Sequence, residues 1–231
     1  MVPVGLGVLV LLAGFFAVVT KRHHDQQSQL IRMTGIPATV STPLAALMAL
    51  SPLPAKAAPD FTLTDQTGRQ LSMSSFRGHA VVLEFMDTHC TDICPIVSQE
   101  FIDAHHDLGS AASNVVFVAV NVNSYHASVA DVAGFTHEHQ LNTISDWHFF
   151  TGTPSELQKV WTNYGIVVQA PSPTADIIHS SFVFFIDPNG NERYLANPTD
   201  DHTASGAAFL PAGPLASWGQ GLALVSQSLV R

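Results

Sequence analysis

The sequence predicts a mixed α/β fold in which helices flank a sheet of buried strands. Residues 80–86 and 115–120 are nearly continuous apolar runs, as expected for strands that are covered on both faces. A segment with apolar residues at helical spacing follows each run. Asp187-Pro188-Asn189-Gly190 then separates two further apolar stretches, which indicates an antiparallel hairpin.

The other elements follow from the same local patterns. Thr153, Pro154 and Glu156 supply an N-cap, a proline in the first turn and an acid at the third helical position, so a helix should begin there. We expect further helices at residues 95–108, 129–140 and 214–229. We expect strands at residues 61–64, 69–73, 80–86, 115–120, 147–150, 181–186 and 192–195. This alternation, closed by a hairpin and a helix, is typical of a thioredoxin-like sandwich.

The chain of 231 residues is expected to contain one folded domain, at 59–231, and an N-terminal appendage. Residues 2–20 are all apolar, Gly, Pro or Thr, which is long enough for a helix to cross a hydrocarbon core of about 30 Å. We therefore predict a transmembrane anchor at 1–20. A cleaved signal peptide is the main alternative, but its usual basic n-region is missing.

Residues 21–58 are polar and proline-rich apart from one short apolar segment, and we expect them to form a tether. Lys21 and Arg22 follow the anchor, which by the positive-inside rule favours a cytoplasmic domain. Two basic residues beside an uncharged N-terminus are, however, a weak signal for orientation. We expect a membrane-anchored protein whose soluble domain lies on the extracytoplasmic face, periplasmic or outer.

Composition excludes some functions. The net charge of −9 argues against nucleic acid as a partner, because binding to phosphates needs clustered Lys and Arg. Neighbouring histidines such as His105 and His106 lack a Cys or carboxylate at ligand spacing, so we do not expect them to bind metal. Two cysteines are too few for a disulfide framework, but their close spacing is typical of redox and metal sites.

Cys90 and Cys94 lie where the strand at 80–86 leads into the helix at 95–108, at the sheet edge where sites gather. Pro95 suits the first helical position, which places Cys94 at the helix start and Cys90 in the preceding loop. A helix N-terminus stabilises a thiolate, the form that attacks disulfides and binds metals. Both chemistries remain open at this point.

Three residues separate the cysteines, which leaves more room between the sulfurs than a Cys-x-x-Cys turn does. Thiolates favour Cu(I), and an imidazole as third ligand also suits Cu(II). His179 comes just before the strand expected at 181–186, so it can reach the same sheet end and supply that ligand.

These residues resemble the Sco/SenC family of copper chaperones. The resemblance covers roughly residues 59–197 and rests on Cys90-x-x-x-Cys94-Pro95, on the helix opening at Gly152-Thr153-Pro154, and on His179 before a strand. It implies that Cys90, Cys94 and His179 bind copper. It also implies a function in assembling the dinuclear copper centre of cytochrome c oxidase, with a copper-accepting oxidase subunit as partner.

The chain departs from the family pattern at two places. Asp87 and Thr91 stand where the family usually has Tyr before the first cysteine and Pro after it. Residues 121–125 replace the family's Val-Asp-Pro stretch. The acid of the family motif is kept as Asp92, which we expect to cap the helix.

Three other functions were weighed for the cysteines. A thiol–disulfide oxidoreductase, with Cys90 and Cys94 as its catalytic pair, is the main alternative, so enzymatic activity stays open. A purely structural disulfide would close too small a loop to stabilise the fold much. A peroxiredoxin-type peroxidase would fit Pro59-Asp60-Phe61 and Thr88-x-Cys90, but it needs an arginine near the thiol.

Overall fold

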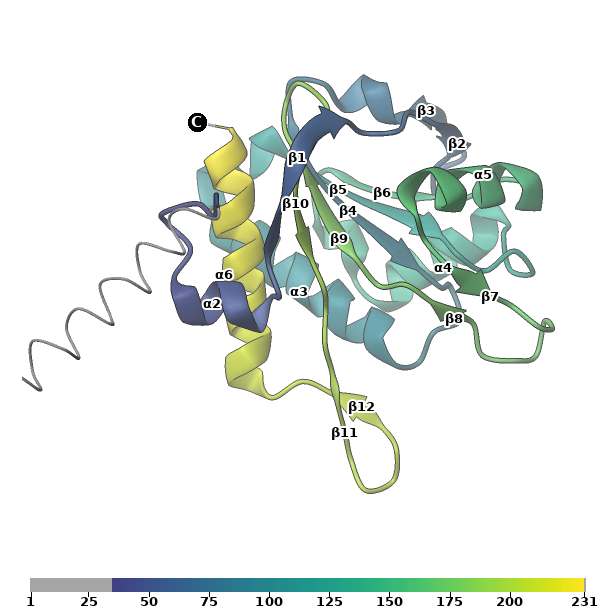
Figure 1. Ribbon diagram of the computed structural model, residues 1–231. Helices are drawn as coiled ribbons and strands as arrows, with labels where there is room; N and C mark the ends of the chain where they lie inside the picture. Colours follow the sequence, from purple (N-terminus) through teal and green to yellow (C-terminus); the bar gives the residue numbers. More distant parts are fainter. Residues whose placement is uncertain (1–34, 231) are drawn as a thin grey trace, which may run out of the picture. The chain divides into compact units, whose positions relative to one another are not determined.

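The computed structural model describes residues 35–230 and is built on a six-stranded mixed sheet (Figure 1). The strand order is β1-β10-β9-β4-β5-β6. Strands β4, β5 and β6 are parallel, whereas β9, β10 and β1 continue the sheet in antiparallel pairs. Their bounds are β1 Ser51–Ala57, β4 Ala80–Met86, β5 Val115–Asn121, β6 Trp147–Phe150, β9 Val183–Ile186 and β10 Asn191–Ala196. The sequence-based prediction of a mixed sheet of the thioredoxin-like type is confirmed.

Helices cover both faces of this sheet (Figure 1). Their bounds are α2 Thr42–Leu47, α3 Ile93–Leu108, α4 Val129–Glu138, α5 Pro154–Tyr164 and α6 Ala212–Leu229, with short 3-10 turns at Met73–Phe76, Gly109–Asn114 and Leu141–Thr143. On one face, Phe101 of α3 packs on Phe117, with ring centroids 5.3 Å apart. On the other face, Trp161 of α5 joins the core cluster that contains Leu83 and Phe85. Successive residues of β4 thus enter two different cores.

Local signals in the sequence explain where α5 starts and where the chain turns between β9 and β10. Thr153 accepts a hydrogen bond from the Glu156 amide while the Glu156 side chain accepts one from the Thr153 amide, so the predicted capping box of α5 is present. In the predicted hairpin, Gly190 has a φ of +79°, which glycine adopts without strain. Strands β9 and β10 pair directly across this turn.

The folded domain begins before Pro59, where we had expected the tether to end. Residues 51–57 form β1, which pairs with β10 at the sheet edge. Met48, just after α2, is fully buried, and its carbonyl accepts a hydrogen bond from the Asn197 amide. Pro52 and Pro54 made this stretch look like a tether, but an edge strand tolerates proline because its outer side has no pairing partner.

The N-terminal anchor predicted at 1–20 lies outside the described residues. No helix between residues 35 and 230 is both long enough and apolar enough to span a membrane.

Three two-stranded hairpins surround the sheet. The first, β2 Thr62–Thr64 with β3 Gln70–Ser72, was expected from the sequence. The other two were not: β7 Val168–Gln169 pairs with β8 Ile178–His179, and β11 Asp201–His202 pairs with β12 Ala208–Phe209. The β7–β8 hairpin carries His179, and the β11–β12 hairpin carries His202, which contacts Asp92.

Candidate functional site

The candidate site lies at the sheet edge where β4 and β5 end, which we call the cysteine edge. Met86 and Asn121, the last residues of the two parallel strands, are paired neighbours there. Strand β9 runs antiparallel to β4 and so begins at the same edge. This topology carries the loop after β4 and the segment before β9 to one end of the sheet.

The two cysteines lie together at the start of α3. Both are free thiols; Cys94 is 2% exposed, whereas Cys90 is half-buried. The Cys94 amide donates a hydrogen bond to Cys90 Sγ over 3.4 Å. The helix begins at Ile93, so Cys94 is at its first turn and Cys90 in the loop before it, as the sequence predicted.

The hydrogen bonds between the thiols make them chemically unequal. The Cys94 thiol and the amides of Cys94 and Asp92 stabilise the Cys90 thiolate, which lowers the pKa of Cys90 to about 7 although burial opposes this. The pKa of Cys94 is raised well above its usual value by its bond to Cys90 and by burial. Cys90 is therefore the thiol that ionises first, and it is also the accessible one.

His179 lies on β8, in the hairpin that precedes β9. Its Nδ1 lies 3.0 Å from the Ser180 carbonyl, which can only accept, so Nδ1 carries the proton and Nε2 keeps a free lone pair. Burial lowers the pKa of His179, while the bond to Ser180 and the Asp87 carboxylate oppose the shift. The imidazole is thus neutral near pH 7, which is its ligand form.

The structure brings Cys90 and Cys94 together but does not close the three-ligand set. The two sulfurs and a ring nitrogen of His179 do not all lie within 4.8 Å of one another. His179 nevertheless lies near enough to the cysteine edge for Asp87 to influence its pKa. The joint role of Cys90, Cys94 and His179 as copper ligands stays a prediction.

Asp87 joins the loops that follow β4 and β5. Its Oδ1 accepts hydrogen bonds from the His89 amide at 2.9 Å and from Asn123 Nδ2 at 2.8 Å. Both Asp87 and Asn123 are places where the chain departs from the Sco/SenC pattern, and the structure shows that the two departures contact each other. Asp87 is buried.

Asp92 occupies the N-cap position of α3 but makes no capping hydrogen bond, contrary to our expectation. Its Oδ1 instead lies 3.3 Å from His202 Nε2, which is 3.6 Å from Asp200 Oδ2. The hairpin β11–β12 thereby contacts the start of the cysteine helix. The partner was not predictable because it lies more than a hundred residues along the chain.

Two buried carboxyl groups lie behind the site, on the α3 side of the sheet. Glu84 of β4 accepts a hydrogen bond from Ser181 Oγ at 3.0 Å, which ties the segment between His179 and β9 to the central strand. Burial raises the pKa of Glu84 to about 8 and that of Glu100 to about 9. Neither Glu100 oxygen has a hydrogen-bond partner among the described residues. Both acids are therefore protonated at neutral pH.

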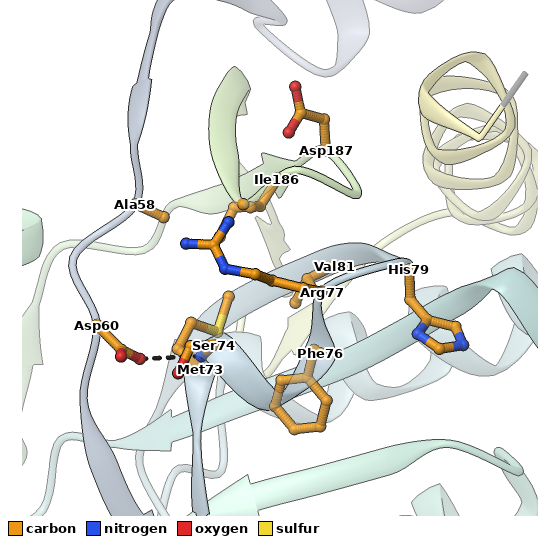
Figure 2. Close-up of a pocket in the computed structure, with 11 residues that line it drawn as sticks. Ala58, Asp60, Met73, Ser74, Phe76, Arg77, His79, Val81, Ile186 and Asp187 are labelled. Atoms are coloured by element: carbon orange, nitrogen blue, oxygen red, sulfur yellow. Dashed lines mark hydrogen bonds between the residues drawn. The ribbon is translucent and has the colours of Figure 1, made fainter.

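A hollow of about 380 Å³ opens at Cys90, lined also by His89, Glu138 and His139. A second hollow lies at the opposite sheet edge, which we call the turn edge, and holds only about 20 Å³, room for one water (Figure 2). There Arg77 extends toward the turn and donates to the Asn189 carbonyl. Of these two hollows, only the one at Cys90 has room for more than a water molecule.

Three donor side chains at the cysteine edge were missed by the sequence analysis: His89, His126 and Asp131. Each offers one ligand atom within 4.8 Å of the other two. They come from three separate loops or helix ends, so no spacing pattern in the sequence indicated them.

Comparison with known proteins identifies the relatives of the chain. The family model described as SCO1/SenC matches residues 51–208. The SCO1 protein homolog of Bacillus subtilis is 25% identical over 132 residues, which is 56% of this chain and 68% of that protein. The chain spans about half the length of the mitochondrial SCO2 homologues that it also matches, such as that of Danio rerio.

Solved structures share the fold. That of Bradyrhizobium japonicum ScoI with copper bound has 20% identity and a TM-score of 0.56, covering 74% of this chain and 99% of its own. That of BsSco, described as a member of the Sco family of cytochrome c oxidase assembly proteins with a disulfide switch, has 22% identity and a TM-score of 0.54, covering 74% and 95%.

A rice chloroplastic peroxiredoxin Q also matches, at 27% identity over 61% of this chain. The arginines at residues 35–230 all lie away from the thiols. Arg69 pairs with Asp65, Arg77 contacts the turn edge, and Arg193 pairs with Asp187. The described part of the chain therefore lacks the arginine that a peroxidase needs beside its cysteine.

Proposed function

Since the chain belongs to the SCO1/SenC family, we propose that it is a copper metallochaperone that assists assembly of the dinuclear copper centre of cytochrome c oxidase. The observation that carries the proposal is the pair of free thiols at the start of α3, one of them ionised near neutral pH. Two structural relatives support it, because one is described with copper bound and another as belonging to a family of oxidase assembly proteins.

We infer that Cys90, Cys94 and His179 hold the copper cargo. Thiolates favour Cu(I), and an imidazole makes the set suitable for Cu(II) as well. His179 presents Nε2 in the neutral form, with Nδ1 fixed by the Ser180 carbonyl. Completing the site requires the β7–β8 hairpin to approach the cysteines. Val167 and Ile178 of this region are 60% and 66% exposed, so the hairpin has an open apolar side that an acceptor subunit can contact.

Copper titration of the reduced chain tests this assignment. We expect one copper ion to bind with thiolate-to-copper absorption, and the Cys90→Ser and Cys94→Ser variants to weaken binding by at least about 100-fold, more than is typical for outer-shell changes. His179→Ala should weaken it by at least about 10-fold. His106→Ala, at an exposed position on α3, is the matched control and should bind as the wild type does. Unaltered affinity in His179→Ala would remove the three-ligand model.

A thiol–disulfide oxidoreductase is the second candidate, favoured by the pKa of about 7 at Cys90. The Cys90 thiolate would attack a disulfide of the copper-accepting subunit, and Cys94 would release the mixed disulfide. The acceptor thus gains two thiols, while Cys90 and Cys94 become a disulfide. Mixing the reduced chain with an oxidised acceptor peptide without copper separates the candidates. Rapid formation of peptide thiols indicates exchange chemistry, and their absence indicates a chaperone.

We also propose that residues 1–20 anchor the protein and that its domain lies on the extracytoplasmic face. The apolar run at 2–20 supports the anchor. Labelling Cys90 in intact cells with a membrane-impermeant thiol reagent tests the orientation. Labelling that requires cell lysis would contradict the proposed side.

A further inference from the structure

His89, which directly precedes Cys90 in the sequence, forms a stacked pair with His126. Their ring centroids are 3.6 Å apart and the ring planes are inclined by 22°. His89 belongs to the loop between β4 and α3, which we call the cysteine loop, whereas His126 belongs to the loop between β5 and α4. No ring nitrogen of either histidine makes a hydrogen bond to another described residue. Within residues 35–230, the four ring nitrogens are therefore available to bind a ligand.

The backbone holds both histidines in place. The His126 amide donates to Asn123 Oδ1 at 3.1 Å, and its carbonyl accepts from Thr88 Oγ1 at 3.1 Å and from Asn121 Nδ2 at 2.9 Å. The His89 amide is held by the Asp87 carboxylate. Such support from surrounding groups is what keeps ligand side chains in position before a metal arrives.

Asp131 completes the group from the first turn of α4. Its Oδ2 accepts hydrogen bonds from the Ser128 amide at 2.9 Å and from Ser128 Oγ at 2.6 Å. These bonds fix the carboxylate and leave Oδ1 free. Donor atoms of His89, His126 and Asp131 all lie within 4.8 Å of one another, near the separation of about 3 to 4 Å between ligands that each bind at about 2 Å.

We propose that His89, His126 and Asp131 form a second metal site, distinct from the Cys90–Cys94 pair and suited to Cu²⁺. Two imidazoles and a carboxylate are nitrogen and oxygen donors, which hold divalent late transition metals, and Cu²⁺ is bound most tightly among them. Thiolates, in contrast, favour Cu⁺. The cysteine edge thus offers two donor sets, of which only the first has thiolates that favour Cu⁺.

The other group of donors at this edge is less suited to a metal. Asp92, Asp200 and His202 also lie within 4.8 Å of one another, but His202 Nε2 already contacts both carboxylates, at 3.3 and 3.6 Å. Those contacts account for the arrangement without an ion. His89 and His126 have no such partners, and His89 also lines the hollow at Cys90, from which an ion can enter.

The test uses the full chain with Cys90→Ser and Cys94→Ser, so that its outcome does not depend on the thiol site. We expect this chain to bind Cu²⁺ and to show nitrogen hyperfine coupling in its electron paramagnetic resonance spectrum. Adding His126→Ala should remove one equivalent of Cu²⁺ or weaken it by at least about 10-fold. Adding His89→Ala should do the same, and because His89 is exposed this variant keeps the test valid if His126→Ala unfolds.

Matched controls on the same background are His179→Ala and His106→Ala, both of which should leave the bound Cu²⁺ unchanged. Copper that persists in both His89→Ala and His126→Ala overturns the site, as does copper lost with His179→Ala. A parallel titration with Zn²⁺ tests the metal. Tighter binding of Zn²⁺ than of Cu²⁺ would overturn the assignment to copper.

Discussion

Asp87 and Asp187 invite comparison because each follows the last residue of a central strand, at opposite edges of the sheet. Asp87 follows β4 and Asp187 follows β9, and both are 6% exposed. Asp87 accepts hydrogen bonds from the His89 amide and Asn123. Asp187 accepts from the amides of Asn189 and Asn191, at 3.0 and 2.9 Å, and pairs with Arg193 at 3.2 Å.

The two aspartates differ in whether the polar side chains near them have partners. At the turn edge both arginines have a partner in the turn: Arg193 contacts Asp187, and Arg77 contacts the Asn189 carbonyl. At the cysteine edge Asp87 fixes a loop whose candidate ligand side chains, His89 and Cys90, make no such pairs among the described residues. A buried aspartate at a strand end therefore organises structure in both places, and the free donors beside Asp87 distinguish the edge that carries the candidate site.

The largest effect that separates the two edges is expected from Asp187→Ala. The variant loses several hydrogen bonds and leaves Arg193 without its partner, which should lower the free energy of unfolding by about 2 to 4 kcal/mol. Copper affinity should not change, because the turn edge is remote from the thiols. Urea unfolding and copper titration of the same sample measure both quantities. A large loss of copper affinity in a folded variant would show that the edges are coupled.

Acid adds a test of the same turn. Burial raises the pKa of Asp187, but hydrogen bonds from Asn191 and Arg193 outweigh it, so the net pKa lies below 3.8. A group whose pKa is lower in the folded chain than in the unfolded chain stabilises the fold at pH values above its unfolded pKa. This contribution is lost as the pH falls toward the folded pKa. The stability difference between wild type and Asp187→Asn should therefore shrink below about pH 4. A constant difference would contradict this ionised role.

The next largest effect is expected from Asp87→Ala, which should lower copper affinity more than stability. Removing this acceptor frees the His89 amide and Asn123, so the cysteine loop loses its fixed position. Copper affinity should fall by about 10- to 100-fold, as for other residues that hold metal ligands in place. The free energy of unfolding should fall by only about 1 kcal/mol.

Asp87→Asn is the conservative control, because an amide oxygen can still accept both hydrogen bonds. It should retain most of the copper affinity. If Asp87→Ala binds copper as the wild type does, Asp87 has no role in positioning the site.

Much of the fold was predictable because its signals are local. Continuous apolar runs identified β4 and β5, and a capping box identified the start of α5. Strand β1 was missed because its prolines suggested a tether, and only its pairing with β10 makes it a strand. The pairing of β11 with β12 likewise depends on contacts between distant segments, which a local pattern does not contain.

For the site too, only the part with a local sequence signal was predictable. The spacing of Cys90 and Cys94 before Pro95 located the thiols and the helix that holds them. Their unequal acidity was not predictable, because it depends on burial and on the direction of a hydrogen bond. His126 and Asp131 gave no signal for a different reason: they meet His89 only because β4 and β5 end side by side.

The smallest effect at pH 5 is expected from Glu84→Gln, which probes the strand that joins the two edges. Burial raises the pKa of Glu84 to about 8, so the native chain holds a proton that the unfolded chain loses above about pH 4.5. Stability therefore falls as pH rises from about 5 to 8, and levels off above the folded pKa.

Glutamine keeps the shape and the acceptor for Ser181 Oγ but removes this titration. The slope of unfolding free energy against pH should become shallower by up to about 1.4 kcal/mol per pH unit, with near-equal stability at pH 5. Urea unfolding at several pH values measures the slope. Burial keeps the pKa of Glu100 raised in both proteins, although the variant loses the repulsion from Glu84 that adds to this shift. Equal slopes in the two proteins would mean that Glu84 is ionised in the native state.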